Sequence, residues 1–288
     1  MDPVLLGQLA LNGVVLGLVY GLVGLGLSLV LGVMGVLNIA HGALYVIGGY
    51  FAFIVSAELD LSPILGVLVA VLGTFLVGVI IDRGIVSPVS NDPARVMMIT
   101  FGLAIVLGQL ALLTFGGNPV TTRPIIASSV VFGPFYVQSQ TLLASLVGVA
   151  VAGLTVVFLM RTKVGKSMRM VSQNVEAAQS IGIRTKRIMS IALGLGSAFS
   201  GLAGALLIPI YLDFPDAQWK PLTAAFVVVI VGGLGSVTGS MVGGLLFGIL
   251  ETVGSYFFPA GSDIFVLVLI IAIILVRPTG LFGSKDRI

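Results

Sequence analysis

The sequence predicts an all-α integral membrane protein, a bundle of about eight transmembrane helices with two interrupted or re-entrant segments. First, 58% of the 288 residues are hydrophobic and only 9% are charged, whereas a soluble domain carries roughly 25% charged residues. Second, the mean hydropathy is +1.20. Third, the apolar runs exceed the ~20 residues that a helix needs to cross a bilayer, and they lack the alternating pattern of outer-membrane strands.

The first apolar run is too long for uninterrupted helices. Residues 4–57 contain no Asp, Glu, Lys or Arg, and about 54 residues would make roughly 80 Å of helix, too much for two simple spans. Glycine and polar residues gather in the middle, at Gly32, Gly35, Asn38, His41 and Gly42. We therefore predict a break at residues 31–42, whose freed backbone must be buried in protein or line a cavity.

The remaining spans follow from the other apolar runs. We expect them near residues 63–81, 96–115, 139–159, 188–212 and 263–276. Between them, residues 117–138 mix prolines and glycines with β-branched and aromatic residues, which predicts a hairpin-like external segment. Residues 213–220 hold acidic side chains and the only tryptophan, which suits an external interface. The run 222–258 is too long for one span and slightly short for two, so we predict a second break at residues 232–239.

Residues 161–187 form the one long segment that is typical of a water-exposed loop. It holds seven of the 14 basic residues and a single carboxylate, namely Arg161, Lys163, Lys166, Arg169, Arg184, Lys186 and Arg187 with Glu176. The positive-inside rule predicts a cytoplasmic loop, and the spans after it place the C-terminus in the cytoplasm. Because basic residues lie at the ends of apolar runs rather than beside polar surface, we expect no nucleic-acid partner.

A short helix is predicted inside this loop. Asn174 can cap the first free amides, Glu176 lies in the first turn, where the helix dipole favours a carboxylate, and Gly182 can close the C-terminus in a left-handed conformation. So short a helix is not stable alone in water and needs something to pack on. Small Ala177 and Ala178 would permit close approach of a partner.

No enzymatic site is predicted. The chain has no cysteine and a single histidine, His41, so neither a thiolate metal site nor a catalytic dyad can be assembled from its residues. A glycine-rich phosphate loop followed by Lys-Ser or Lys-Thr is also missing from the sequence. We expect no cofactor, no ATP hydrolysis by the chain itself and no enzyme activity.

The residues at the two breaks and one carboxylate in an apolar run are candidates for lining a transport pathway. They are Asn38, His41, Gly42, Gly232, Gly233, Gly235 and Glu251. Interrupted helices in corresponding positions of two halves indicate such a pathway, but the glycines would equally allow close helix packing. Asn38 and His41 either face the pathway or, the preferred interpretation, bond to loose backbone at the break. Glu251 either functions in transport or holds a neighbouring helix through Asn12, Gln109 or a backbone amide.

The sequence of the predicted short helix resembles a motif of a known protein family. The sequence EAAQSIG at residues 176–182 resembles the EAA loop of the permeases of ABC importers. In that family the loop is a coupling helix that docks into a groove on the ATPase subunit. The resemblance therefore implies that Asn174, Glu176, Ala177, Ala178 and Gly182 couple the chain to an ATPase.

Three longer stretches make the resemblance more specific. Residues 11–51, 232–245 and 276–284 resemble branched-chain amino acid permeases of the LivH type. This implies a single transmembrane permease domain over residues 1–288 with its cytoplasmic coupling loop at 161–187. It also implies a second homologous permease subunit, two ATP-binding subunits and an extracytoplasmic solute-binding protein as partners, in the lipid of the inner or plasma membrane.

The expected cargo is leucine, isoleucine and valine or other hydrophobic amino acids. Related permeases carry urea or short amides, sugars and nucleosides, so these remain alternatives within the same kind of machine. A rival interpretation from another class is a stand-alone secondary transporter or channel, in which Glu251 or His41 would carry protons or ions.

Overall fold

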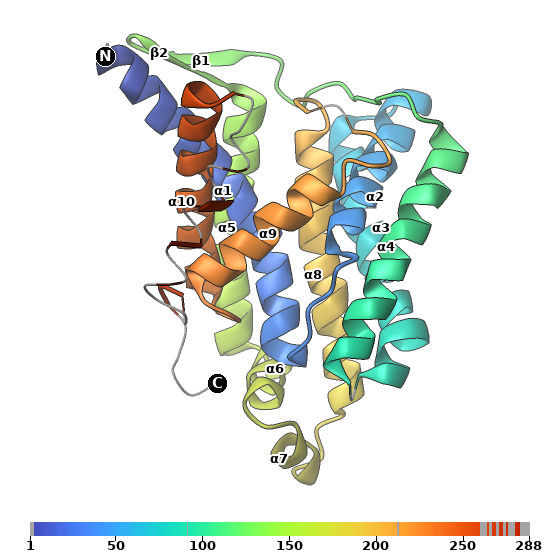
Figure 1. Cartoon of the computed structure of the whole chain (residues 1–288). Coiled ribbons are helices and arrows are strands. Elements are labelled where there is room, and N and C mark those ends of the chain that lie inside the picture. Colours follow the sequence, from blue (N-terminus) through green and yellow to red (C-terminus); the bar gives the residue numbers. More distant parts are fainter. Residues whose placement is uncertain are drawn as a thin grey trace.

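The computed structural model describes residues 3–90, 92–211, 213–259, 264, 267–268, 271–272, 275 and 280–282. The predicted span at 263–276 and the basic tail after residue 282 lie largely or wholly outside the described residues. Figure 1 shows a bundle with a β-hairpin at one end and short helices at the other. We call these the hairpin end and the basic end.

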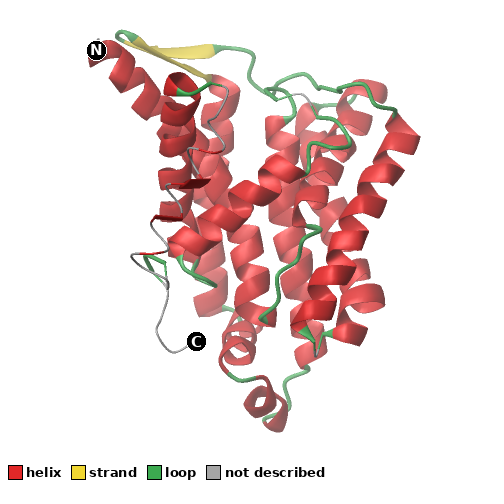
Figure 2. Ribbon diagram, viewed as in Figure 1, coloured by secondary structure: helices red, strands yellow, loops and turns green. Residues whose placement is uncertain are grey.

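The described residues form helices with one small hairpin. The helices are α1 (Pro3–Met34), α2 (His41–Phe53), α3 (Pro63–Ile81), α4 (Pro93–Phe115), α5 (Ser139–Arg161), α6 (Lys163–Gln173), α7 (Val175–Ser180), α8 (Thr185–Leu207), α9 (Trp219–Gly232) and α10 (Val237–Phe257). Among them, six are long and apolar enough to cross a membrane: α1, α3 with its continuation to Val89, α4, α5, α8 and α10. The prediction of an all-helical, multi-pass membrane protein is confirmed, and the shorter α2 and α9 adjoin the two breaks (Figure 2).

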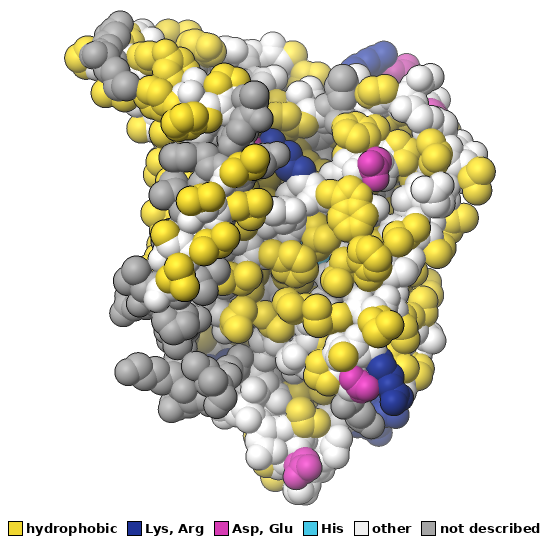
Figure 3. All heavy atoms as spheres, in the orientation of Figure 1, with side chains coloured by type: hydrophobic (Ala, Val, Ile, Leu, Met, Phe, Trp, Pro, Cys, Tyr) yellow, Lys and Arg dark blue, Asp and Glu magenta, His cyan; other side chains and the backbone are white. Residues whose placement is uncertain are grey.

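Helices α1 and α8 form the centre of the bundle, and α3, α4 and α5 lie outside them. Nearly every residue of α1 from Val15 to Val30 is buried, whereas α3 exposes Leu68, Leu72 and Leu76 along one side. Large apolar side chains exposed in this way suit contact with lipid. Figure 3 shows such side chains spread over the flank of the bundle.

Glycines let these helices approach at backbone distance. A side-chain carbon at Gly248 of α10 would collide with the backbone of Gly17 in α1, and one at Gly48 of α2 would collide with Gly201 in α8. Small residues at helix contacts are the common way to pack helices in a membrane. The packing explanation for glycines therefore applies to these positions.

The first break is present where it was predicted. Helix α1 ends at Met34, residues 35–40 run back into the bundle without helix, and α2 begins at His41 near mid-height (Figure 1). Two side chains satisfy the exposed backbone. Thr100 Oγ1 accepts from the Ile39 amide at 3.1 Å, and Asn38 Oδ1 accepts from the Ala40 amide at 3.1 Å.

The second break separates α9 from α10. Gly233 and Gly235 have φ angles of 103° and 77°, which favour glycine, and Ser236 Oγ caps α10 by accepting from the Gly239 amide at 3.0 Å. The end of α9 is capped by a segment from far along the chain. The amides of Leu281 and Phe282 donate to the carbonyls of Val231 and Gly232 at 2.8 and 3.1 Å.

The hairpin end also agrees with the prediction in part. Strands β1 (Ser129–Phe132) and β2 (Phe135–Gln138) pair antiparallel within the predicted segment. Helix α8, however, ends at Leu207 rather than near residue 212, because Pro209 has no amide to continue the ladder. The following loop turns back into the bundle, where residue 213 bridges to Val120.

Replacing a contact glycine tests this packing. Gly248→Ala should destabilise the folded chain by about 1–3 kcal/mol, because a methyl group there overpacks the contact between α10 and α1. Gly153→Ala on α5 is the control, because its methyl group meets no atom within 4 Å and should stabilise the helix by up to about 1 kcal/mol. Thermal unfolding of the detergent-purified chain measures both, and an unchanged midpoint for Gly248→Ala would contradict the packing.

Candidate functional site

The predicted short helix lies at the basic end as α7. Asn174 Oδ1 accepts from the Ala177 amide at 2.9 Å, so Asn174 caps the helix as predicted. Gly182 has φ 84°, and the Ile183 amide donates to the Ala178 carbonyl at 3.0 Å, which closes the C-terminus. The local signals read from the sequence therefore correspond to the geometry of this segment.

The two alanines of α7 face different ways. Ala178 is buried and packs in a cluster with Met168 and Val171 of α6 and Ile188 of α8. Ala177 is exposed, as are Asn174, Glu176 and Gly182. The expectation that both alanines face a partner therefore needs correction, because Ala178 is the side chain that anchors α7 to its own chain.

Helix α6 was not predicted. Its apolar residues Val164, Met168 and Val171 recur at helical spacing and turn toward α1 and α8, while its lysines and arginine remain exposed. This spacing was the signal for the helix, but it is hidden between residues that are mostly basic or polar. The outcome is a two-helix projection, α6 and α7, surrounded by the exposed basic side chains of the loop (Figure 1).

The two breaks meet each other. A side-chain carbon at Gly32 would lie 3.1 Å from the Cα atom of Gly235, and Ser28 Oγ donates to the carbonyl of Ser236 at 3.3 Å. Positions about 200 residues apart in the chain are thus adjacent in the bundle. Movement at one break would therefore displace the other.

Most of the pathway candidates are buried in this structure. His41 is fully buried, and its Nε2 donates to the Val23 carbonyl at 3.0 Å, while its own carbonyl accepts from Ser200 Oγ at 2.9 Å. Asn38 and Gly42 are buried as well, and Gly42 packs against the backbone of residue 218. The bond from the Ala40 amide to Asn38 supports the interpretation in which polar residues satisfy loose backbone, whereas the His41 ring bonds to a carbonyl in the middle of α1.

The glycines of the second break are similarly enclosed. Gly232 and Gly233 are buried and Gly235 is half-buried. Glu251, in contrast, lines a large cavity formed by the described residues.

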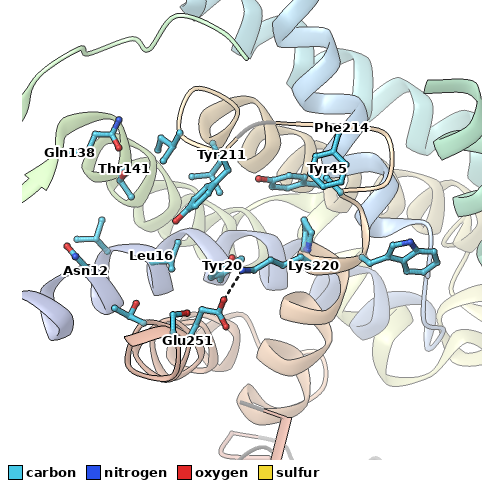
Figure 4. A pocket seen from close by; sticks show the side chains of 18 of the residues that line it. Asn12, Leu16, Tyr20, Tyr45, Gln138, Thr141, Tyr211, Phe214, Lys220 and Glu251 are labelled. Carbon is cyan, nitrogen blue, oxygen red and sulfur yellow. Dashed lines mark ion pairs between the residues drawn. The ribbon is translucent and has the colours of Figure 1, made fainter. Parts of the chain in front are cut away.

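This cavity lies toward the hairpin end and has a volume of about 1020 Å³. Its wall is built by α1, α2, α5, α9, α10 and the loop between α8 and α9 (Figure 4). Much of the lining is apolar or aromatic, including Leu16, Tyr20, Tyr45, Tyr211, Phe214 and Trp219. Such a concave, largely apolar space with few polar groups is the usual form of a small-molecule site.

An ion pair between two helices lies in the wall of the cavity. Lys220 Nζ, at the start of α9, lies 2.8 Å from Glu251 Oε1 of α10. The side chain of Glu251 is 7% exposed and that of Lys220 is 62% exposed. The interpretation in which Glu251 holds a neighbouring helix named Asn12, Gln109 or a backbone amide as its partner, and the partner observed is Lys220 of α9. The available signal was that Lys220 is the only basic residue between Arg187 and Arg277.

Asp213 corrects a second expectation. The acidic residues of the loop before α9 were expected at an external interface, but Asp213 is 3% exposed and sits against Gly49 of α2. Its Oδ1 accepts from the Phe214 amide at 3.1 Å, and its Oδ2 has no hydrogen-bond partner among the described residues. Burial raises the pKa of Asp213 well above its usual value of 3.8.

Apolar helices, two of them short and joined to breaks, thus surround an internal cavity whose wall carries a charge pair. Broken helices around a central space are characteristic of membrane transport proteins. The fold and the cavity therefore define a multi-pass membrane protein of the transport class.

The comparisons with known proteins identify the family. The chain belongs to the family described as "Branched-chain amino acid transport system / permease component", whose profile matches residues 9–276. The family is one of transport permeases, so the chain is a permease component and not an enzyme.

Two individual relatives match over nearly the whole length, and a third matches over part of its length. The chain is 31% identical to the high-affinity branched-chain amino acid transport system permease protein LivH of Salmonella typhimurium, over 97% of this chain and 96% of the relative. It is 28% identical to BraD of Pseudomonas aeruginosa over the same shares. It is 26% identical to LivM of Escherichia coli, over 77% of this chain and 58% of LivM.

One solved structure shares the fold. PsaBC from Streptococcus pneumoniae, solved in complex with Fab, aligns with a TM-score of 0.51, covering 96% of this chain and 92% of that chain. The sequence identity is 14%, so this likeness concerns the fold alone.

The burial of Asp213 predicts a pH dependence of stability. The pKa of Asp213 is raised in the folded state. At pH values above the usual pKa of an aspartate, the folded chain therefore binds more protons than the unfolded chain, and the free energy of unfolding falls as pH rises. Asp213→Asn mimics the protonated form and should reduce this loss. Thermal unfolding midpoints across a series from acid to alkaline buffer measure it.

The control is Asp216→Asn, the same substitution on an exposed side chain of the same loop. Its midpoint should follow the pH dependence of the wild type. An equal pH dependence for Asp213→Asn and the wild type would contradict the raised pKa.

Proposed function

We propose that the chain is a translocation subunit of a binding-protein-dependent ABC importer that moves leucine, isoleucine and valine into the cell. The observation that carries this proposal is the capped, exposed α7 at the basic end, combined with the cavity at the opposite end. A permease driven by an external ATPase needs both a docking element on the ATPase side and a space for the solute.

The charges support the orientation. All seven basic residues of the segment 161–187 are exposed, which favours a cytoplasmic basic end under the positive-inside rule. The cavity then faces the outside of the inner or plasma membrane, where a solute-binding protein would deliver its ligand. The C-terminus is proposed to lie in the cytoplasm.

The proposed complex has a second permease subunit, two ATPases and a solute-binding protein. Similarity to both LivH and LivM, each named a permease protein of the high-affinity branched-chain amino acid transport system, favours a pairing of homologous permeases. Asn174, Glu176, Ala177 and Gly182 form the exposed face that would contact an ATPase, beside Ile181, which is 62% exposed. Exposed apolar surface of this kind is typical of a docking site.

The packing provides a path for the motion. The cluster that holds Ala178 also contains Leu29 and Val33 of α1, which flank Gly32, the residue that touches the second break. If an ATPase displaces α7, the end of α1 at the basic end and both breaks would therefore move as well. We propose that this displacement opens the pathway alternately to the two sides.

Uptake and co-purification test the function. Cells that express the chain with its partners should accumulate labelled leucine only when the ATPase subunits are active, and the chain should co-purify with those subunits. Uptake driven by an ion gradient in the isolated chain would instead establish the secondary-transporter interpretation.

The coupling face is tested by Glu176→Lys and Gly182→Asp. Both should lower ATP-dependent uptake by about tenfold or more, the first by reversing an exposed charge and the second by straining a left-handed backbone position. The amount of chain in the membrane should remain unchanged. The control is Glu58→Lys, the same charge reversal on an exposed residue at the hairpin end. Wild-type uptake by Gly182→Asp would count heavily against the coupling role.

Thiol labelling tests whether the breaks line the conduit. The chain lacks cysteine, so single thiols can be placed at Asn38, which is buried here, and at Leu234, which is 53% exposed. We expect the thiol at Asn38 to react with aqueous reagents in at least one nucleotide state of the complex. Leu22→Cys, in the core of α1, is the control and should stay protected. Protection of both break positions in every state would place the pathway elsewhere.

A further inference from the structure

Another cavity lies at the basic end, as a groove between α6 and α8. Its volume is about 450 Å³, which is within the range of about 300–1,000 Å³ that is common for small-molecule sites. Figure 1 shows α6, α7 and the start of α8 together at this end of the bundle. Apolar and basic side chains share the lining of the groove, which includes Val164, Ile183, Ile188, Ile191, Arg184 and Arg187.

Arg184 and Arg187 bring uncompensated positive charge to the groove. Both are exposed, and within the described part of the chain neither forms an ion pair with a carboxylate. Glu176 is the only carboxylate of the segment 161–187, which holds seven basic residues. A guanidinium group presents its N–H donors in a planar fork that matches the oxygens of a phosphate. The groove is therefore suited to a phosphate group.

The groove lies where two helices that can span the membrane end. Helix α5 ends at Arg161, three residues before Val164, and α8 begins directly after Arg184. Ile191 is four residues further along α8 than Arg187, so the two lie on the same side of the helix with a rise of about 6 Å between them. The headgroup layer on each side of a bilayer is about 5–8 Å thick. When the arginines lie at the level of the headgroups, Ile191 therefore lies at the level where the acyl chains begin.

We propose that this groove binds one anionic phospholipid of the leaflet at the basic end. The phosphate of the lipid lies against Arg184 and Arg187, and the start of an acyl chain lies along Ile191 and Val164. Basic pockets between membrane helices are a common form of site for anionic lipid headgroups. The inference goes beyond the proposed function, because it depends neither on the transported solute nor on an ATPase.

The apolar part of the groove favours a lipid over other anionic ligands. Val164 and Ile191 are half-buried and lie at the ends of membrane spans, a depth that an acidic segment of a water-soluble partner protein does not reach. A free phosphate ion would bind the arginines but leave these apolar side chains uncovered. An acyl chain covers them, and each buried CH₂ group raises the affinity about fourfold.

Lipid binding can be measured on the full chain in detergent by native mass spectrometry. The probes are dioleoyl phosphatidylglycerol, which is anionic, and dioleoyl phosphatidylcholine, which has the same acyl chains and no net charge. The chain should retain one phosphatidylglycerol with an affinity about tenfold or more above that for phosphatidylcholine. Inorganic phosphate and glycerophosphoglycerol, which lack acyl chains, should compete about a hundredfold or more weakly than phosphatidylglycerol.

The variants are Arg184→Gln, Arg187→Gln and the two combined. Each single change should weaken the binding of phosphatidylglycerol about fivefold and the combined change about thirtyfold, because a positive charge facing the phosphate is lost each time. Both side chains are exposed, so the fold should be kept, which the unfolding midpoint in phosphatidylcholine checks. The control is Arg169→Gln, the same substitution on an exposed residue of α6 outside the lining, and its affinity should remain within about twofold of the wild type.

Retention of one phosphatidylglycerol that depends on both arginines supports the site. Equal affinity for the two lipids, or an unchanged affinity of the combined variant for phosphatidylglycerol, overturns it. Competition by inorganic phosphate as strong as that by the lipid assigns the groove to a free anion and overturns the lipid site as well. If the combined variant loses co-purification with ATPase subunits while it binds phosphatidylglycerol like the wild type, the groove is a protein contact. Uptake of leucine by the complete complex tests the proposed function separately, so either can fail alone.

Discussion

The rest of the structure depends on the need to satisfy backbone hydrogen bonds inside an apolar bundle. A helix satisfies its own backbone, whereas a break within the membrane does not, and each unpaired group there costs several kcal/mol. In this chain the partners come from distant elements. At the first break, the side chains of Thr100 and Asn38 accept hydrogen bonds from backbone amides, and at the end of α9 the amides of segment 280–282 donate to its last carbonyls. The breaks are possible only because several helices pack around them.

Close packing of helices at glycines is the second requirement of the structure. Gly17 and Gly248 bring α1 and α10 to backbone distance, and Gly48 and Gly201 do the same for α2 and α8. The two breaks lie next to each other at Gly32 and Gly235. A central α1 therefore serves two purposes, because it is both the packing surface for its neighbours and the support of the broken segments.

Local features were predictable from the sequence, and contacts between distant segments were not. The cap at Asn174, the left-handed Gly182 and the positions of both breaks follow from residue types within a few positions of each other. Their roles in coupling and in lining a pathway remain predictions. The partner of Glu251 depends on how α9 crosses α10, so it could not be read from spacing along the chain. For the same reason the burial of Asp213 was missed, since it depends on contacts with α2 and Val120.

The second break lies between the two members of the cavity ion pair. Lys220 is near the start of α9, Glu251 is in the middle of α10, and the glycines at 233 and 235 join the two helices. A change of angle at those glycines would alter the separation of the two charges, and Coulomb energy between partly buried charges varies strongly with distance. The same glycine turn touches Gly32, whose neighbours Leu29 and Val33 pack with the cluster beneath α7. Packed side chains and one glycine turn therefore connect the basic end to the charge pair in the cavity, and they give the proposed coupling a physical route.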